Sequence, residues 1–161
     1  MQLLISDANI LIDLEEGELL EQLFRLPYQF TVPDILFFEE LEVQHGHLLR
    51  RGLALGELSS DTMLYASNLM ARVRGPSRND CFALALARQE NCPLLSGDEA
   101  LRHTARNEAV EVRGTLWVVE EMIQKQVITV GQAREAYERM RANARRLPWA
   151  MAYQRLDDLF P

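Results

Sequence analysis

Residues 3–11 read LLISDANIL, and this stretch decides the fold. The run Leu3–Asp7 is apolar until its final acid, which predicts a strand buried on both faces, as in a parallel sheet covered by helices. The apolar spacing after Asp7 predicts a helix that continues to about Leu26, where Pro27 stops it. The stretch therefore predicts the first strand–helix unit of an α/β fold.

The same alternation continues along the chain. We expect further strands at residues 29–32, 53–58, 93–96 and 110–112. Helices are expected between them, and a last long helix begins at the capping box of Thr129 and Gln132 and ends near Pro148. The expected architecture is an α/β three-layer sandwich with a central parallel sheet in Rossmann-like order. Residues 1–128 would form this domain, and residues 129–161 a helical C-terminal extension of it.

The length and composition exclude several classes of protein. A chain of 161 residues is one ordinary domain, and 48% hydrophobic residues exclude wholesale disorder. Two cysteines, Cys81 and Cys92, are too few for a disulfide framework and are expected to be buried and reduced. The N-terminus lacks the basic region of a signal peptide, and no apolar run is long enough to span a membrane. We therefore expect a cytoplasmic protein with no membrane partner.

The charge is unevenly distributed around a net value of -7. Residues 1–42 contain ten acids and one base, whereas residues 132–156 contain six arginines and two acids. Such an asymmetry is typical of two solvated helix faces. It is also what a surface that meets RNA phosphate or an acidic partner would require. The sequence leaves both interpretations open.

Four acids occupy positions where an open parallel sheet forms its binding crevice, beyond the carboxyl ends of the strands. Asp7 and Asp98 follow two predicted strands, Asp80 lies in the first turn of a central apolar helix, and Glu40 lies on the helix after the second strand. Each alone has an ordinary explanation, as a helix cap, a dipole partner or a surface residue. Gathered in one crevice, they would repel each other unless a hard divalent cation such as Mg²⁺ or Mn²⁺ neutralised them. That cation would activate water for in-line attack on a phosphodiester.

These elements resemble the PIN domain family. The resemblance is carried, in the family's order, by DANILID at 7–13, Glu40-Leu41, SRND at 77–80 with the alanine–leucine run after it, and LLSGD at 94–98. The stretch VEVRGTLW at 110–117 is similar to the end of a toxin subgroup. The resemblance covers residues 1–128 and extends less clearly to 161.

The resemblance implies a Mg²⁺- or Mn²⁺-dependent endoribonuclease that cleaves single-stranded RNA. Its small bacterial members include the VapC-like toxins, which act as homodimers and have a cognate antitoxin protein. Carried over to this chain, the catalytic and metal-binding acids are Asp7, Glu40, Asp80 and Asp98, with Asn9 and Ser96 in support. The run of Glu39, Glu40 and Glu42 around Leu41 leaves Glu39 open as the second acid.

Other interpretations stay open at this point. A PIN-like domain that no longer cleaves would serve as a protein- or RNA-binding module. A structure-specific DNA nuclease is disfavoured because those relatives carry insertions for which 161 residues leave little room. The pair His45 and His47 is expected to lie in a loop rather than to bind a metal, because only one further histidine, His103, exists in the chain.

Overall fold

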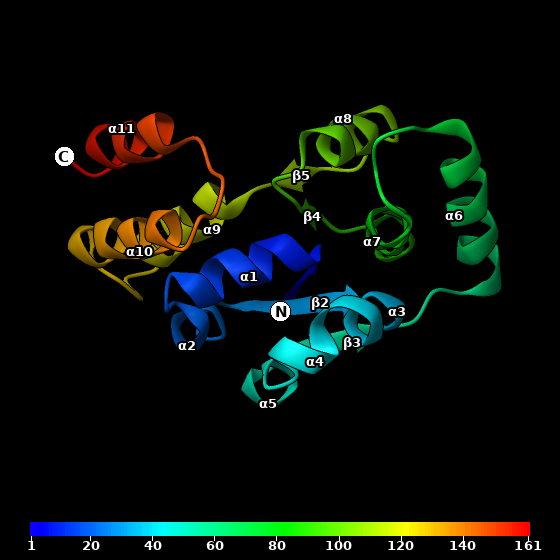
Figure 1. Ribbon diagram of the computed structural model, residues 1–161, viewed down its shortest axis with the longest axis horizontal. Coiled ribbons are helices and arrows are strands. Elements are labelled where there is room, and N and C mark those ends of the chain that lie inside the picture. Colours follow the sequence, from blue (N-terminus) through cyan, green and yellow to red (C-terminus); the bar gives the residue numbers. More distant parts are fainter.

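One sheet of five strands, all in parallel pairs, forms the centre of the molecule, in the order β3-β2-β1-β4-β5. The computed structural model describes residues 1–161, and Figure 1 shows the arrangement of its elements. The strands are β1 Gln2–Ser6, β2 Tyr28–Pro33, β3 Ala54–Gly56, β4 Leu94–Leu95 and β5 Val112–Arg113. This confirms the expected α/β class and the parallel sheet.

The chain reverses its direction across the sheet at β1. It runs outward from β1 to β2 and β3, and then returns to β4 on the other side of β1, so that Ile5 pairs with both Thr31 and Leu94. Because strand–helix–strand crossovers are right-handed, the two directions place their helices on opposite faces of the sheet. The point between β1 and β4 is the topological switch point, where ligands bind in open α/β sheets.

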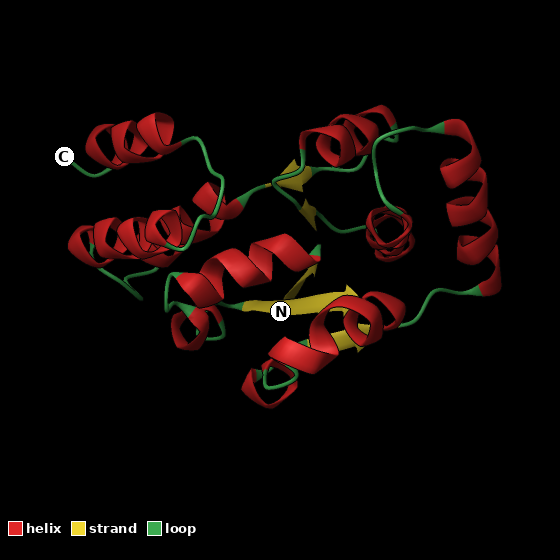
Figure 2. Cartoon of the chain, viewed as in Figure 1, coloured by secondary structure: helices red, strands yellow, loops and turns green.

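Helices cover both faces of the strands, which gives the three layers (Figure 2). Helix α7 packs against β1, β2 and β4 and against α6 and α8, while α1 packs against α2, α9 and α10. The helical segments are α1 Ala8–Glu16, α2 Leu20–Leu23, α3 Asp34–Leu36, η1 Phe37–Leu41, α4 Glu42–His45, α5 Leu48–Arg51, α6 Ser60–Arg72, α7 Arg78–Glu90, α8 Glu99–Asn107, α9 Thr115–Gln124, α10 Val130–Ala142 and α11 Trp149–Leu159. The segment η1 is a π-helical turn within this set.

Two helices end earlier than the sequence predicts. The first was expected to reach Leu26, but α1 stops at Glu16 because Glu18 adopts a left-handed backbone conformation, with a φ of 58°. The last long helix was expected to end near Pro148, but α10 stops at Ala142 because Ala144 is left-handed, with a φ of 62°, and the separate helix α11 begins at Trp149. The loop between α10 and α11 therefore turns back toward the sheet, which brings its arginines to the site described below.

The C-terminal helices share the core of the sheet domain. A single cluster of 42 buried apolar residues includes Tyr137, Met140 and Leu156 together with Leu4 and Ile5 of β1. Helices α10 and α11 lie together at one end of the molecule, beside α1 and α9 (Figure 1). No helix is both long enough and apolar enough to cross a membrane.

Candidate functional site

Two acids cap helices that start at the carboxyl edge of the sheet. Asp7 ends β1 and is the N-cap of α1, where its Oδ1 accepts a hydrogen bond from the Ile10 amide at 3.0 Å. Asp98 follows β4 and is the N-cap of α8, where its Oδ1 accepts from the Leu101 amide at 2.8 Å. Since β1 and β4 are neighbours, the two caps flank the switch point of the sheet.

Asp80 lies at the start of α7, whose N-terminus is at the same edge because a crossover helix runs antiparallel to the strands it connects. It forms a capping box with Ser77: the Ser77 amide donates to Asp80 Oδ2 at 2.9 Å, and the Asp80 amide donates to Ser77 Oγ at 3.1 Å. A serine followed three residues later by an acid is the sequence pattern of such a box. The three acids therefore lie at the N-cap or in the first turn of a helix, where the positive end of the helix dipole stabilises negative charge.

Asp7 is the most perturbed of these acids. Its residue is only 2% exposed, and burial raises its pKa from 3.8 to about 7. Hydrogen bonds from the Ser96 side chain and the Ile10 amide lower this pKa, whereas the negative charges of Asp80 and Asp13 raise it further. The environment therefore disfavours an ionised Asp7 and favours any cation that would neutralise it.

The charges of the three acids also act on one another. The pKa of Asp80 is raised mainly by burial, is lowered by its hydrogen bonds with Ser77, and is raised further by the charge of Asp98. The charge of Asp80 in turn raises the pKa of Asp7. The three acids therefore form a series, Asp7–Asp80–Asp98, in which each neighbouring pair is coupled. Asp98 differs from the other two because it is exposed. The fold brings three of the four predicted acids to one edge with their charges coupled.

The second predicted acid is placed differently. Glu39, the alternative, accepts a hydrogen bond from Asn79 Nδ2 at 3.1 Å and pairs with Arg78, and these bonds lower its pKa. Both donors belong to the first turn of α7, directly before Asp80. Glu40 is exposed and makes no side-chain hydrogen bond or ion pair. The π-helical turn η1 contains both glutamates and turns Glu39 toward α7.

The side chains do not enclose an ion as they are placed. No group of three His, Cys, Asp or Glu side chains is arranged to hold a metal ion. One oxygen of Asp80 and one of Asp98 accept backbone amides, and the second oxygen of each has no hydrogen bond. All candidate donors in this region are carboxylate, amide or hydroxyl oxygens, which are the ligands that Mg²⁺ and Mn²⁺ prefer.

The two predicted supporting residues have different surroundings. Ser96 is fully buried between the acids: its Oγ accepts from the Asp98 amide at 3.1 Å, and its hydrogen bond lowers the pKa of Asp7. Asn9 is exposed, and its Oδ1 accepts a hydrogen bond from Arg145 at 3.1 Å. Ser96 therefore links two of the acids, whereas Asn9 contacts the loop between α10 and α11.

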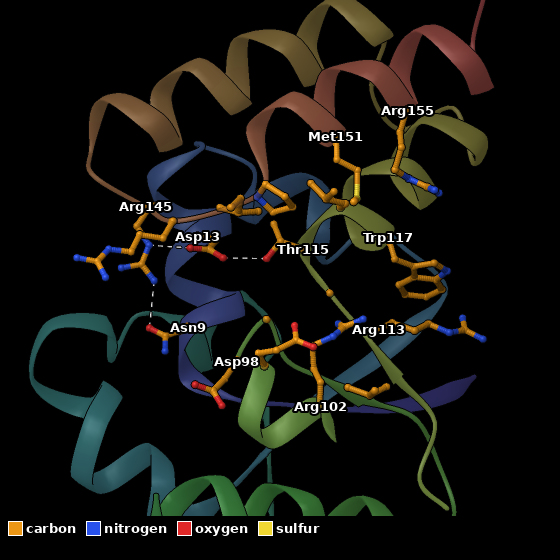
Figure 3. Close-up of a pocket in the computed structure, with 18 of the residues that line it drawn as sticks. Asn9, Asp13, Asp98, Arg102, Arg113, Thr115, Trp117, Arg145, Met151 and Arg155 are labelled. Atoms are coloured by element: carbon orange, nitrogen blue, oxygen red, sulfur yellow. Dashed lines mark hydrogen bonds and ion pairs between the residues drawn. The ribbon is translucent and has the colours of Figure 1, made fainter. Parts of the chain in front are cut away.

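Arg145 also joins this loop to a buried acid. Its Nε donates to Asp13 Oδ1 at 2.7 Å, and Thr115 Oγ1 donates to Asp13 Oδ2 at 2.8 Å (Figure 3). Burial raises the pKa of Asp13, and the bonds from Arg145 and Thr115 lower it. Asp13 is only 7% exposed and contacts two segments distant in sequence.

A large pocket opens next to the acids, between α1, α8, β5 and the α10–α11 loop. Its volume is about 980 Å³, and Asn9, Asp13 and Asp98 form part of its wall (Figure 3). Six arginines line it: Arg102, Arg106, Arg113, Arg145, Arg146 and Arg155. The acid motifs did not reveal this pocket. The signal in the sequence was the excess of arginine in residues 132–156, which supplies three of the six.

The histidines and cysteines take no part in this region. His45 Nδ1 and His47 Nε2 both contact the carboxylate of Glu15, away from the predicted acids. Cys81 is buried as predicted, and Cys92 is half-buried. Burial raises the pKa of both thiols, which disfavours the reactive thiolate.

The fold and the site together define a class: a parallel α/β sandwich with acidic side chains at the switch point of its sheet. The family model DUF3368, described as a PIN domain, matches residues 3–159. The chain therefore belongs to this PIN domain family, and its fold is a nuclease-type fold. The match includes the C-terminal helices as well as the sheet.

Comparison with solved structures gives a distant neighbour. A PilT N-terminus domain protein from the hyperthermophilic archaeon Sulfolobus solfataricus P2 superposes with a TM-score of 0.48 and 13% sequence identity. The superposition covers 76% of this chain and 94% of that one. No curated protein matches the sequence.

Proposed function

We propose that this protein is a Mg²⁺- or Mn²⁺-dependent endoribonuclease that cleaves single-stranded RNA in the cytoplasm. The observation that carries the proposal is Asp7, a carboxylate buried at the switch point whose pKa is raised to about 7. Neutral asparagine or serine would cap α1 equally well. A buried carboxylate costs free energy whenever it is ionised, so its presence at this position indicates a function.

The residues that would hold the metal are Asp7, Asp80 and Asp98, with Glu39 or Glu40 as the fourth acid. The oxygen donors suit a hard cation, and the exposed Asp98 has room to turn toward the buried acids. When bound, the metal would activate a water molecule and neutralise charge on the phosphodiester under attack.

The protein's own groups prepare the acids for this role. Amides of α1 and α8 fix one oxygen each of Asp7 and Asp98, and the Ser77 amide at the N-cap of α7 fixes one oxygen of Asp80, which orients the other oxygen of each acid. Ser96 orients Asp7 through the hydrogen bond that also lowers its pKa. Because ligands must be deprotonated to bind a metal, the raised pKa of Asp7 makes metal binding weaken as the pH falls below about 7.

Cleavage of a labelled single-stranded RNA with Mg²⁺, Mn²⁺ or EDTA tests the proposal. We expect cleavage with either metal, none with EDTA, and none by Asp98→Asn, whose amide oxygen still caps α8. Asp61→Asn is the matched control, because Asp61 is an exposed aspartate in the first turn of α6. Cleavage that persists in EDTA, or in a double variant with Asp7→Asn and Asp98→Asn, would reject the proposal.

We also propose that the nuclease is a VapC-like toxin that forms a homodimer and is silenced by an antitoxin. The acidic edge suits an inhibitor with a basic arm, since a guanidinium group matches carboxylates in a bidentate way. A short upstream reading frame that encodes a protein with such an arm would support the toxin role. Light scattering of the purified protein measures its mass in solution, and the mass of a monomer would reject the proposed homodimer.

A second candidate function is a PIN-like module that binds RNA or protein without cleaving. It is favoured by one observation: Asp7, Asp80 and Asp98 each accept a backbone hydrogen bond at the start of a helix, a structural role that needs no metal. Calorimetric titration with Mn²⁺ separates the two functions. A protein that binds no divalent ion at millimolar concentration but holds a partner is the binding module.

A further inference from the structure

The pocket beside the acids concentrates positive charge in an acidic protein. The chain as a whole carries a formal charge of -7, yet this pocket contains six arginines and only three acids, Asp13, Asp98 and Glu99. The arginines come from α8, β5, the α10–α11 loop and α11, so the fold gathers them from separate segments. A cavity of about 980 Å³ lined by arginines suits a large anionic ligand with more than one charged group.

Four of the arginines are already engaged. Arg102 donates to the Ser96 carbonyl at 2.8 Å, Arg145 binds Asp13, and the other two pair with glutamates: Arg113 with Glu111 and Arg155 with Glu120. These bonds hold the four side chains at the wall of the pocket.

Two arginines remain free for a ligand. Arg146 is exposed and has no hydrogen bond or ion pair, and Arg106 is exposed with only a 3.9 Å approach to the exposed Glu99. They belong to the α10–α11 loop and to α8, so they approach the pocket from two different segments. An ion pair as exposed as that of Arg106 contributes little free energy and is readily exchanged for a phosphate.

The pocket also has a flat stacking surface. The Arg113 guanidinium lies over the Trp117 ring, 4.4 Å from its centroid, and Tyr28 contacts the same ring at a centroid distance of 5.8 Å. Trp117 and Glu111 therefore hold the Arg113 plane in place. Proteins that bind single-stranded RNA stack bases on aromatic rings and on arginine planes of this kind. Figure 3 shows Arg113 and Trp117 on one side of the pocket and Asp98 on the opposite side.

We propose that this pocket binds the single-stranded RNA strand on one side of the cleavage point, an inference that rests on the proposed function. Arg106 and Arg146 bind backbone phosphates, and a base stacks on the Arg113 plane. Asp98 lines the pocket and belongs to the acid series, so a strand seated here continues directly to the acids. The C-terminal segment is then part of the substrate site. An acidic protein segment would use the phosphate-binding arginines but not the stacking surface.

Fluorescence anisotropy with a labelled single-stranded RNA in EDTA tests this inference without cleavage. We expect Arg106→Ala and Arg146→Ala each to weaken binding by about 3- to 10-fold and to reduce the slope of log K against log salt by about 0.7. Arg113→Ala should also weaken RNA binding. It should reduce the salt slope by no more than the loss of its one charge does. Arg50→Ala, an exposed arginine of α5 outside the pocket, is the control and should bind as the wild type does.

The outcomes distinguish this inference from the proposed function. Weaker binding by the pocket variants without any metal-dependent cleavage would support the pocket and reject the nuclease. Cleavage with undiminished binding by Arg106→Ala and Arg146→Ala would support the nuclease and overturn the pocket. Competition by polyglutamate as effective as that by unlabelled RNA of equal charge would also overturn it, because the stacking surface would then contribute nothing. Charge reversal in Arg146→Glu should weaken RNA binding more than Arg146→Ala does.

Discussion

At the carboxyl edge of the sheet, Asp7, Asp80 and Asp98 each accept a hydrogen bond from an amide three residues away in sequence. In the adjoining pocket, Arg145 binds Asp13 across 132 residues. The acidic edge is thus built from local capping, and the pocket from tertiary contacts. The two regions meet at Asp98 and Asn9, which both line the pocket.

The difference determines how each region responds to change. Replacing an acid by its amide removes charge from the edge but keeps the cap, so function can be lost while the fold remains. Removing Arg145 leaves a buried carboxylate without its cation, so stability changes as well. Substitutions at the acidic edge should therefore change activity without loss of the fold, whereas substitutions in the pocket should lower both activity and stability.

The strongest test of this separation is the loss of cleavage in Asp7→Asn and Asp98→Asn. Since a bound metal contributes several kcal/mol to such a reaction, each variant should lower kcat/KM by roughly 100-fold or more. Circular dichroism should show an unchanged fold. If either variant unfolded, the acids would be structural and the comparison between edge and pocket would fail.

The second test is the stability of Asp7→Asn as a function of pH. The pKa of Asp7 is 3.8 in an unfolded chain and about 7 in the fold, so between these values the folded state binds more protons and stability falls as the pH rises. At pH 8 in EDTA the variant should be more stable than the wild type by up to about 4 kcal/mol, and at pH 3.5 the two should be equal. Urea unfolding measures both, and equal stability at pH 8 would contradict the burial of an ionised Asp7.

The third test addresses the pocket. Arg145→Ala leaves Asp13 buried and unpaired except for Thr115, and should lower the free energy of unfolding by about 3 kcal/mol. Adding Asp13→Asn to this variant should restore part of the loss, because no charge then remains buried. Thermal and urea unfolding of the two single variants and the double variant give the coupling energy. A coupling near zero would make the α10–α11 loop independent of α1.

The smallest effect distinguishes the two glutamates of η1. Glu39 contacts α7 next to Asp80, so Glu39→Gln should reduce cleavage by about 10-fold, as loss of an orienting contact does at metal sites. Glu40→Gln should change it by less than about 2-fold, because its side chain is exposed and unbonded. The reverse result would restore Glu40 as the second acid.

Local features of this molecule could be predicted from the sequence and distant ones could not. The strand before Asp7, the capping box of Ser77 and Asp80 and the parallel sheet each follow from patterns within a few residues. The orientation of Glu39 could not be predicted, because the wide turn of η1 changes the angular position of every later residue relative to an α-helix. Nor could the contact of Arg145 with Asp13, since it depends on where the chain turns after Ala142.

The three helix starts at the sheet edge also bear on how this family can diversify. Asparagine and serine are as good as aspartate at the N-cap of a helix, which is the position of Asp7 and Asp98. A gene copy released from selection for catalysis can therefore exchange its acids for these residues one at a time and still encode a stable domain. The arginine pocket would remain in such a descendant, which would inherit an anion-binding surface already formed and available for a new role.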